Sequence, residues 1–173
     1  MLIVLIGYRG TGKTTVARLL AEQLSLDWID ADVEIERRAG KSIAEMFADE
    51  GESAFRDLET EVIALLTSRK NLVVATGGGA VMREQNREAL AAADEIVWLK
   101  ADAETISLRV SVDATSTSRR PNLTATGGID EIRELLALRE PIYRLSATCQ
   151  VDTVGKSPTE VVDEIAASLG DPK

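Results

Sequence analysis

The segment GYRGTGKT at residues 7–14 has the residue types that bind phosphate groups, spaced as in the pattern GxxxxGK[ST]. Its glycines let backbone N–H groups point inward around phosphate oxygens, and the N-terminus of a following helix adds partial positive charge. In this pattern Lys13 reaches the β- and γ-phosphates, and Thr14 offers its hydroxyl to Mg²⁺. The segment directly follows an apolar run and directly precedes an amphipathic stretch. This context favours a phosphate-binding loop over a plain glycine-rich turn between a strand and a helix. We predict phosphate contacts from Gly10, Thr11, Gly12, Lys13, Thr14 and Thr15.

Two carboxylates, Asp30 and Asp32, follow a short apolar segment at 28–30 in the order Asp-Ala-Asp. Residues two apart in an extended strand face the same side, so both side chains could face the phosphate loop and support Mg²⁺. Asp is also a favoured N-cap, and Asp32 could instead cap a helix that begins at Val33. The sequence leaves both roles open, and they are compatible.

Three further features indicate a small anionic acceptor. Arg56 follows Gly51-Glu52 on an expected helix, the run Gly77-Gly78-Gly79 directly follows an apolar segment, and Arg139 lies just before Pro141. A triple glycine at the end of a strand lets the backbone approach a ligand closely. A guanidinium group suits a carboxylate in bidentate geometry. Each arginine alone would be read as a surface charge, so the prediction depends on the combination.

These residues need a scaffold, and the apolar pattern supplies one. Continuous short apolar runs predict strands buried on both faces at 2–6, 72–75 and 96–99, with weaker candidates at 28–30 and 149–152. Helical spacing occurs between them, for example at Val16, Leu20 and Leu24. The alternation predicts an α/β fold: a P-loop three-layer sandwich with a five-stranded parallel sheet and helices on both faces. The other expected helices span 53–68, 83–92, 103–110, 129–145 and 158–169.

The organisation along the chain is expected to be one domain over residues 1–173. Residues 113–128, DATSTSRRPNLTATGG, form a long Ser-, Thr- and Gly-rich stretch with two adjacent arginines. A loop of this length in a compact domain is typical of a lid, so we predict a mobile lid there. Residues 32–60 are expected to form a helical region that binds the acceptor. In parallel sheets of this kind, ligands bind beyond the carboxyl ends of the strands.

Composition excludes several classes of function. The chain has 173 residues, a formal net charge of −9 and only two each of Phe, Trp and Tyr, so nucleic-acid binding is not expected. It has no histidine, which excludes Ser-His-Asp and Cys-His catalysis, and its one cysteine, Cys149, cannot form an internal disulfide. The apolar run at the N-terminus is too short for a signal peptide or a membrane span. We expect a cytoplasmic monomer without membrane partners.

Taken in order along the chain, the motifs resemble the shikimate kinase family over nearly the whole length. The matching pieces are GYRGTGKTTVARLLAEQL, the DAD segment, GKSIAEMFADEGESAFRDLE, ATGGGAV, RRPNL, LALREPIYRLSA and VDTVGKSPTEVV. The phosphate loop alone would name only a superfamily, whereas the ordered set is specific. The resemblance implies ATP-dependent phosphorylation of the 3-hydroxyl of shikimate, giving shikimate 3-phosphate and ADP, a step of aromatic amino acid biosynthesis.

The resemblance also implies a role for each matching residue. Lys13 and Arg120 would act on the transferring phosphate, and Asp32 would hold the acceptor hydroxyls as the candidate base. Thr14 and Asp30 would hold Mg²⁺, with ATP as co-substrate. The groups expected to grip the shikimate carboxylate are Arg56, Gly77, Gly78, Gly79 and Arg139, with Glu59 positioning Arg56. The residues expected on the ATP side are Arg109, Arg120, Ser157 and Pro158.

Two features depart from the family pattern. The segment 109–120 is a few residues longer than in many members, and the lid has RPNL where RPLL is more usual. Arg109 is our choice for stacking on adenine, and Arg119 is the alternative to Arg120 as the lid arginine. The alternative functions are a related small-molecule kinase, such as one acting on gluconate, and a nucleotide-binding sensor without turnover. The intact set of Lys13, Thr14, Asp30 and Asp32 argues against the sensor.

Overall fold

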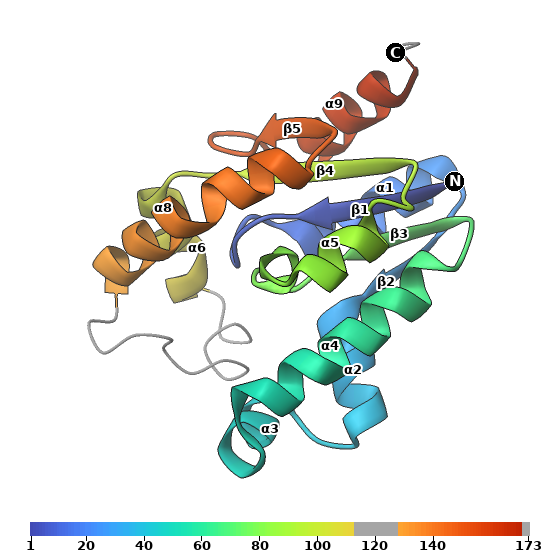
Figure 1. The fold of residues 1–173 in the computed structure, drawn as a ribbon. Coiled ribbons are helices and arrows are strands. Elements are labelled where there is room, and N and C mark those ends of the chain that lie inside the picture. The colour runs from blue at the N-terminus through green and yellow to red at the C-terminus, as the bar shows by residue number, and fades with distance from the viewer. Residues whose placement is uncertain (113–127, 171–173) are drawn as a thin grey trace.

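Five parallel strands form one sheet in the order β2-β3-β1-β4-β5, as Figure 1 shows. This computed structural model describes residues 1–112 and 128–170. The central strand, β1, pairs with β3 on one side and with β4 on the other. The predicted five-stranded parallel sheet is therefore confirmed. Its strands are β1 (Leu2–Ile6), β2 (Asp27–Asp30), β3 (Leu72–Ala75), β4 (Glu95–Lys100) and β5 (Cys149–Asp152).

Helices cover both faces of the sheet, which confirms the predicted three layers (Figure 1). One face carries α1 (Lys13–Leu24) and α9 (Pro158–Gly170), which also pack against each other. The helix α6 (Ala103–Val112) follows β4 and packs against α8. The elements on the opposite face are α2 (Ala31–Ala39), α3 (Ile43–Asp49), α4 (Gly51–Thr67), the short 3₁₀ helix η1 (Ala80–Met82), α5 (Glu84–Leu90) and α8 (Gly128–Ser146).

The central strand shows why the sequence folds this way. All five of its residues are 0% exposed. Alternate side chains of a strand point to opposite faces, and Leu2, Val4 and Ile6 pack on the α4 side while Ile3 and Leu5 pack on the α1 side. Burying one such aliphatic side chain contributes about 1.5–3 kcal/mol. A continuous apolar run is therefore required here, and the run also holds the phosphate loop that follows it.

Two helices begin at reciprocal capping pairs. The Ser42 hydroxyl accepts a hydrogen bond from the Glu45 N–H at 3.2 Å, and the Glu45 carboxylate accepts one from the Ser42 N–H at 2.7 Å. Ser157 and Glu160 make the same pair of contacts, at 3.3 and 2.7 Å, where α9 begins. A cap of this kind is worth about 1 kcal/mol. The second pair defines where the loop after β5 ends, next to the site described below.

Three expectations near the ends of helices and strands are wrong. The strand β2 ends at Asp30, and α2 begins at Ala31, so Asp30 and Asp32 do not share one face of an extended strand. Asp30 is the N-cap, because its Oδ1 accepts from the Asp32 N–H at 2.9 Å; Asp32 does not cap a helix beginning at Val33. Gly128, expected at the end of the lid, is the first residue of α8. The rest of the predicted lid, residues 113–127, lies outside the described residues.

Candidate functional site

The phosphate loop connects β1 to α1 and depends on glycine at two positions. Gly7 has φ +138°, and a Cβ atom on it would lie 2.4 Å from the carbonyl oxygen of Leu99. Gly12 has φ +90° and is the N-cap of α1. Residues with a side chain rarely adopt such backbone angles. The two glycines therefore let the chain turn tightly from the edge of the sheet into the helix. The N-terminus of α1 consequently opens at the carboxyl edge of the sheet, where an anion is stabilised by its N–H groups.

The side chain of Lys13 curls back over this loop. Its Nζ donates to the carbonyl oxygen of Gly7 at 2.8 Å and to that of Tyr8 at 2.7 Å, and the residue is only 8% exposed. Thr11 also donates its hydroxyl to the Tyr8 carbonyl, at 2.8 Å. The ammonium group is therefore held inside the loop. A bound phosphate group could replace the loop carbonyls as its hydrogen-bond partner.

Thr14 and Asp30 form the oxygen-rich side of the loop. The Thr14 hydroxyl donates to Asp30 Oδ2 at 2.6 Å, while Asp30 Oδ1 caps α2. A hydroxyl and a carboxylate are oxygen ligands of the kind that Mg²⁺ prefers, the remaining ligands being water and phosphate oxygens. Within residues 1–112 and 128–170, no group of three or more His, Cys, Asp or Glu side chains is arranged to hold a metal ion by itself. The donor set thus fits a metal ion that arrives with a phosphate group.

Arg56 lies on α4 and its guanidinium group lies against the backbone of Gly79. A Cβ atom at Gly79 would be 2.8 Å from both Nη1 and Nη2 of Arg56, so a side chain at this position would displace the guanidinium group. Nη1 donates to Glu59 Oε2 at 2.7 Å, and Nε and Nη2 each lie 3.2 Å from Glu52 Oε1. Burial lowers the pKa of Arg56, but the charges and hydrogen bonds of Glu59 and Glu52 together raise it, and the net shift is upward, so the group stays charged. This is a fixed cation beside a glycine backbone.

The three glycines after β3 also border the phosphate loop. A Cβ atom on Gly78 would lie 3.2 Å from the backbone nitrogen of Arg9 and 3.5 Å from the Gly7 carbonyl oxygen. The Tyr143 hydroxyl donates to the Gly78 carbonyl, which ties this loop to α8. The glycine run and the phosphate loop are therefore in contact, and glycine is what permits that closeness.

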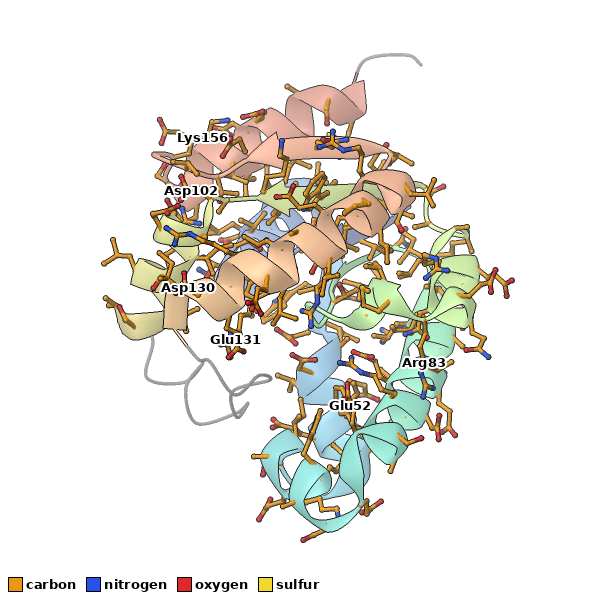
Figure 2. The ribbon with its side chains drawn as sticks, turned by 60° about the vertical axis from the view of Figure 1, so that its left-hand side comes forward. Glu52, Arg83, Asp102, Asp130, Glu131 and Lys156 are labelled. Carbon is orange, nitrogen blue, oxygen red and sulfur yellow. The ribbon has the colours of Figure 1, made fainter. Side chains whose placement is uncertain are left out.

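Arg139 is distant in sequence from the phosphate loop but lies beside it in the structure. It lies on α8, is 9% exposed, and its guanidinium carbon lies 5.5 Å from the centre of the Tyr8 ring. Burial raises the pKa of Tyr8, while the charges of Arg9 and Arg139 partly offset that rise. A cation over an aromatic face is stabilised by the ring quadrupole. In Figure 2 the helix that carries Arg139 crosses in front of the sheet, with Glu131 labelled near its start.

A cavity of about 240 Å³ lies on the other side of the phosphate loop, between that loop, α6 and the segment that connects β5 to α9. Arg109 and Pro158, both predicted here, belong to its wall; Ser157 instead binds Glu160 at the start of α9. Lys156, labelled in Figure 2, forms an ion pair with Glu164. The lining residues are Thr11, Gly12, Thr15, Val16, Arg109, Thr153, Lys156, Pro158 and Val161.

Sequence reasoning missed four of these lining residues: Val16, Thr153, Lys156 and Val161. A signal for Thr153 existed, because it directly follows the strand β5 and ligands bind beyond the carboxyl ends of parallel strands. Tyr8, which lies under Arg139, was also missed, since its position in the phosphate pattern accepts any residue.

The structure brings most of the predicted site together on one edge of the sheet. Lys13 and Thr14 lie at the start of α1, where the phosphate loop ends. Arg56, the glycine run and Arg139 lie beside that loop. Such an arrangement can place a phosphate group and a second anion close to each other. Arg119 and Arg120 lie outside the described residues. In the two described ranges no helix is long and apolar enough to cross a membrane.

Comparison with known proteins identifies relatives of this arrangement. A family model described as "Shikimate kinase" matches residues 9–170. A shikimate kinase from Rhodopirellula baltica is 44% identical over 163 residues, which cover 94% of this chain and 87% of the relative. A solved structure of shikimate kinase from Acinetobacter baumannii in complex with shikimate has a TM-score of 0.90 and 39% identity, covering 97% of this chain and 92% of the other.

A gluconokinase from Sinorhizobium meliloti is similar in fold only. Its structure has a TM-score of 0.60 at 20% identity, and the match covers 96% of this chain and 90% of that one.

Proposed function

The chain belongs to the shikimate kinase family, and from this premise we infer that it transfers the γ-phosphoryl group of ATP to the 3-hydroxyl of shikimate, giving shikimate 3-phosphate and ADP. One observation carries the inference beyond family membership. The glycine run that borders Arg56 also lies against the phosphate loop. A Cβ atom added to Gly78 would be only 3.2 Å from the backbone nitrogen of Arg9. The proposed carboxylate site thus adjoins the phosphate loop, which supports transfer between two anionic substrates.

ATP would bind with its phosphates in the loop of Gly10, Thr11, Gly12, Lys13, Thr14 and Thr15. Lys13 would exchange its bonds to the carbonyls of Gly7 and Tyr8 for phosphate oxygens. Thr14 and Asp30 would hold Mg²⁺, which supplies positive charge to the phosphate oxygens when bound. The adenine base would enter the cavity beside Arg109 and Pro158, because that cavity adjoins the loop at Thr11 and Gly12.

Shikimate would bind through its carboxylate to Arg56, Arg139 and the N–H groups of Gly77, Gly78 and Gly79. The guanidinium fork of Arg56 is already oriented by Glu59, so less conformational freedom is lost on binding. Asp32, in the first turn of α2 and close in sequence to Asp30, would hold the substrate hydroxyls.

In the transfer step the 3-hydroxyl oxygen bonds to the γ-phosphorus as the bond from that phosphorus to the β–γ bridging oxygen breaks, and ADP leaves. Asp32 would orient the hydroxyl and is the proposed acceptor of its proton. Positioning and charge stabilisation dominate this reaction class, so a chain without histidine can catalyse it. Arg120, or Arg119 in its place, is proposed to approach the transferring phosphate from the lid; that role, the monomeric state and the cytoplasmic location stay predictions.

The direct test measures ADP release from ATP and Mg²⁺ with shikimate, with gluconate and without acceptor. We expect ADP only with shikimate. Equal slow release in all three reactions would leave the phosphate loop in place and contradict the acceptor assignment. Release with gluconate alone would assign the chain to a different acceptor.

A further inference from the structure

We propose that Thr153 is a positioning residue for nucleotide binding, which holds Arg109 at the wall of the cavity so that the flat face of its guanidinium group meets the base of ATP. The inference rests on the proposed function, because it takes the cavity beside the phosphate loop as the site of the base. It adds a residue that has no contact of its own with the phosphate or acceptor groups described above.

The contact between the two residues uses both polar groups of Thr153. Nη1 of Arg109 donates to the Thr153 hydroxyl at 2.8 Å, and Nη2 donates to the Thr153 carbonyl oxygen at 2.7 Å. Nη1 also lies 3.4 Å from the carbonyl oxygen of Gly10 in the phosphate loop. Thr153, 44 positions away in the sequence, therefore makes the two shorter contacts with this edge of the guanidinium group, and Gly10 adds a longer one. Hydrogen bonds to a charged donor are stronger than neutral ones, so this edge is firmly placed.

Thr153 is itself fixed. It is 2% exposed, and both its N–H and its hydroxyl donate to the carbonyl oxygen of Lys100, at 2.9 and 2.8 Å. The hydroxyl has one proton, which it donates in the hydrogen bond to the Lys100 carbonyl, so the hydroxyl oxygen presents a lone pair to Arg109. The Thr153 hydroxyl therefore donates to the end of β4 and accepts from Arg109 on α6, so one oxygen atom links the two elements.

The surroundings of Arg109 explain what this placement achieves. The cavity wall includes the apolar side chains of Val16, Pro158 and Val161. Because the edge of the guanidinium group is bound to Thr153, the part left for a ligand in the cavity is the planar face, and guanidinium planes stack on aromatic rings. A long side chain loses rotamer freedom when it packs on a ligand. Thr153 imposes that order on Arg109 before the nucleotide arrives.

The experiment is isothermal titration calorimetry of the Thr153→Val and Thr153→Ser variants with two probes, ADP and inorganic tripolyphosphate, both with Mg²⁺. Valine keeps the shape and removes the hydroxyl, so we expect ADP binding to weaken by about tenfold, as for a hydrogen bond to a charged group. Tripolyphosphate has no base, and its affinity should stay unchanged. Serine keeps the hydroxyl and should restore ADP affinity to within about twofold of the wild type.

A double-mutant cycle with Arg109→Ala makes the test independent of any general weakening of the fold. In the Arg109→Ala background, Thr153→Val should produce no further loss of ADP affinity, because the two residues act as a unit. Wild-type ADP affinity in Thr153→Val, or an equal loss for ADP and tripolyphosphate, would overturn this inference alone. Failure of the wild-type chain to bind ADP would overturn the proposed function together with it.

Discussion

The guanidinium group of Arg56 and the carboxylate of Glu59 form an ion pair within α4, with Nη1 and Oε2 2.7 Å apart and the Glu59 side chain only 1% exposed. Residues three apart on a helix are neighbours on its surface, so the pair forms without distorting the backbone. Its buried position distinguishes it from Glu52, which contacts the same arginine with a side chain 60% exposed. Glu59 therefore sets the direction in which Arg56 faces Gly79.

Replacing Glu59 by glutamine should weaken acceptor binding and stability together. The amide keeps the shape but removes the charge that compensates the half-buried Arg56, which should cost about 2 kcal/mol in the free energy of unfolding. We expect the KM for shikimate to rise while the KM for ATP stays near the wild-type value. The control is Glu61→Gln, an exposed position on the same helix. Unchanged shikimate kinetics in Glu59→Gln would remove its positioning role.

Lys13→Ala should lower kcat by about 10³-fold or more, because a preorganised cation at the transferring phosphate is lost. The lysine is 8% exposed, and two loop carbonyls hold its ammonium group inside the phosphate loop before any ligand binds. Steady-state kinetics at saturating shikimate measures the effect, with the exposed Lys70→Ala as control. A variant with near-normal turnover is incompatible with the phosphate-site assignment.

Arg139→Ala should weaken shikimate binding by about 2–5 kcal/mol, as for a buried charge pair that loses one partner. ATP affinity should change little, because Arg139 meets the phosphate loop at the ring of Tyr8, a residue not assigned to phosphate binding. Arg144→Ala offers a matched control on the same helix: its guanidinium lies over Trp98, at 5.6 Å from the ring centre, and the residue is exposed. Equal losses for both substrates in Arg139→Ala would refute the acceptor role.

Arg120→Ala should reduce kcat more than it changes the binding of either substrate, since a lid arginine acts on the phosphate in transfer. The neighbouring Arg119→Ala is the comparison. Pre-steady-state turnover and equilibrium binding, measured on both variants, separate the two effects. If Arg119→Ala shows the kcat defect and Arg120→Ala does not, the lid arginine is Arg119.

The stability of α2 should depend on pH through Glu34. Hydrogen bonds from Arg37, and then from Arg38, lower the pKa of Glu34 to about 2. A carboxyl group with a lowered pKa stabilises the fold above its unfolded-state pKa, and that contribution is lost as the pH falls toward the folded-state value. Glu34→Gln should therefore cost about 1 kcal/mol at pH 7, and the cost should shrink between about pH 4.5 and 2. Urea unfolding across this range tests it, with the exposed Glu88→Gln as control; a pH-independent difference contradicts it.

The sequence by itself determined the sheet and the phosphate loop. Both depend on local pattern: the five-residue apolar run of β1 must be buried on both faces, and the glycines at 7 and 12 serve backbone turns that follow it directly in the chain. The ordered motifs also identified the family, which the comparison with known proteins confirmed.

Only the tertiary structure decided how distant residues meet. Asp30, not Asp32, caps α2, because the boundary between strand and helix depends on where β3 stops pairing with β2. Arg109 finds Thr153 across 44 positions of sequence, through the pairing of β4 with β5. A side chain at position 79 would have to displace the guanidinium group of Arg56, which occupies the space of a Cβ atom there. Such contacts follow from the packing of helices on the sheet, and no local periodicity encodes them.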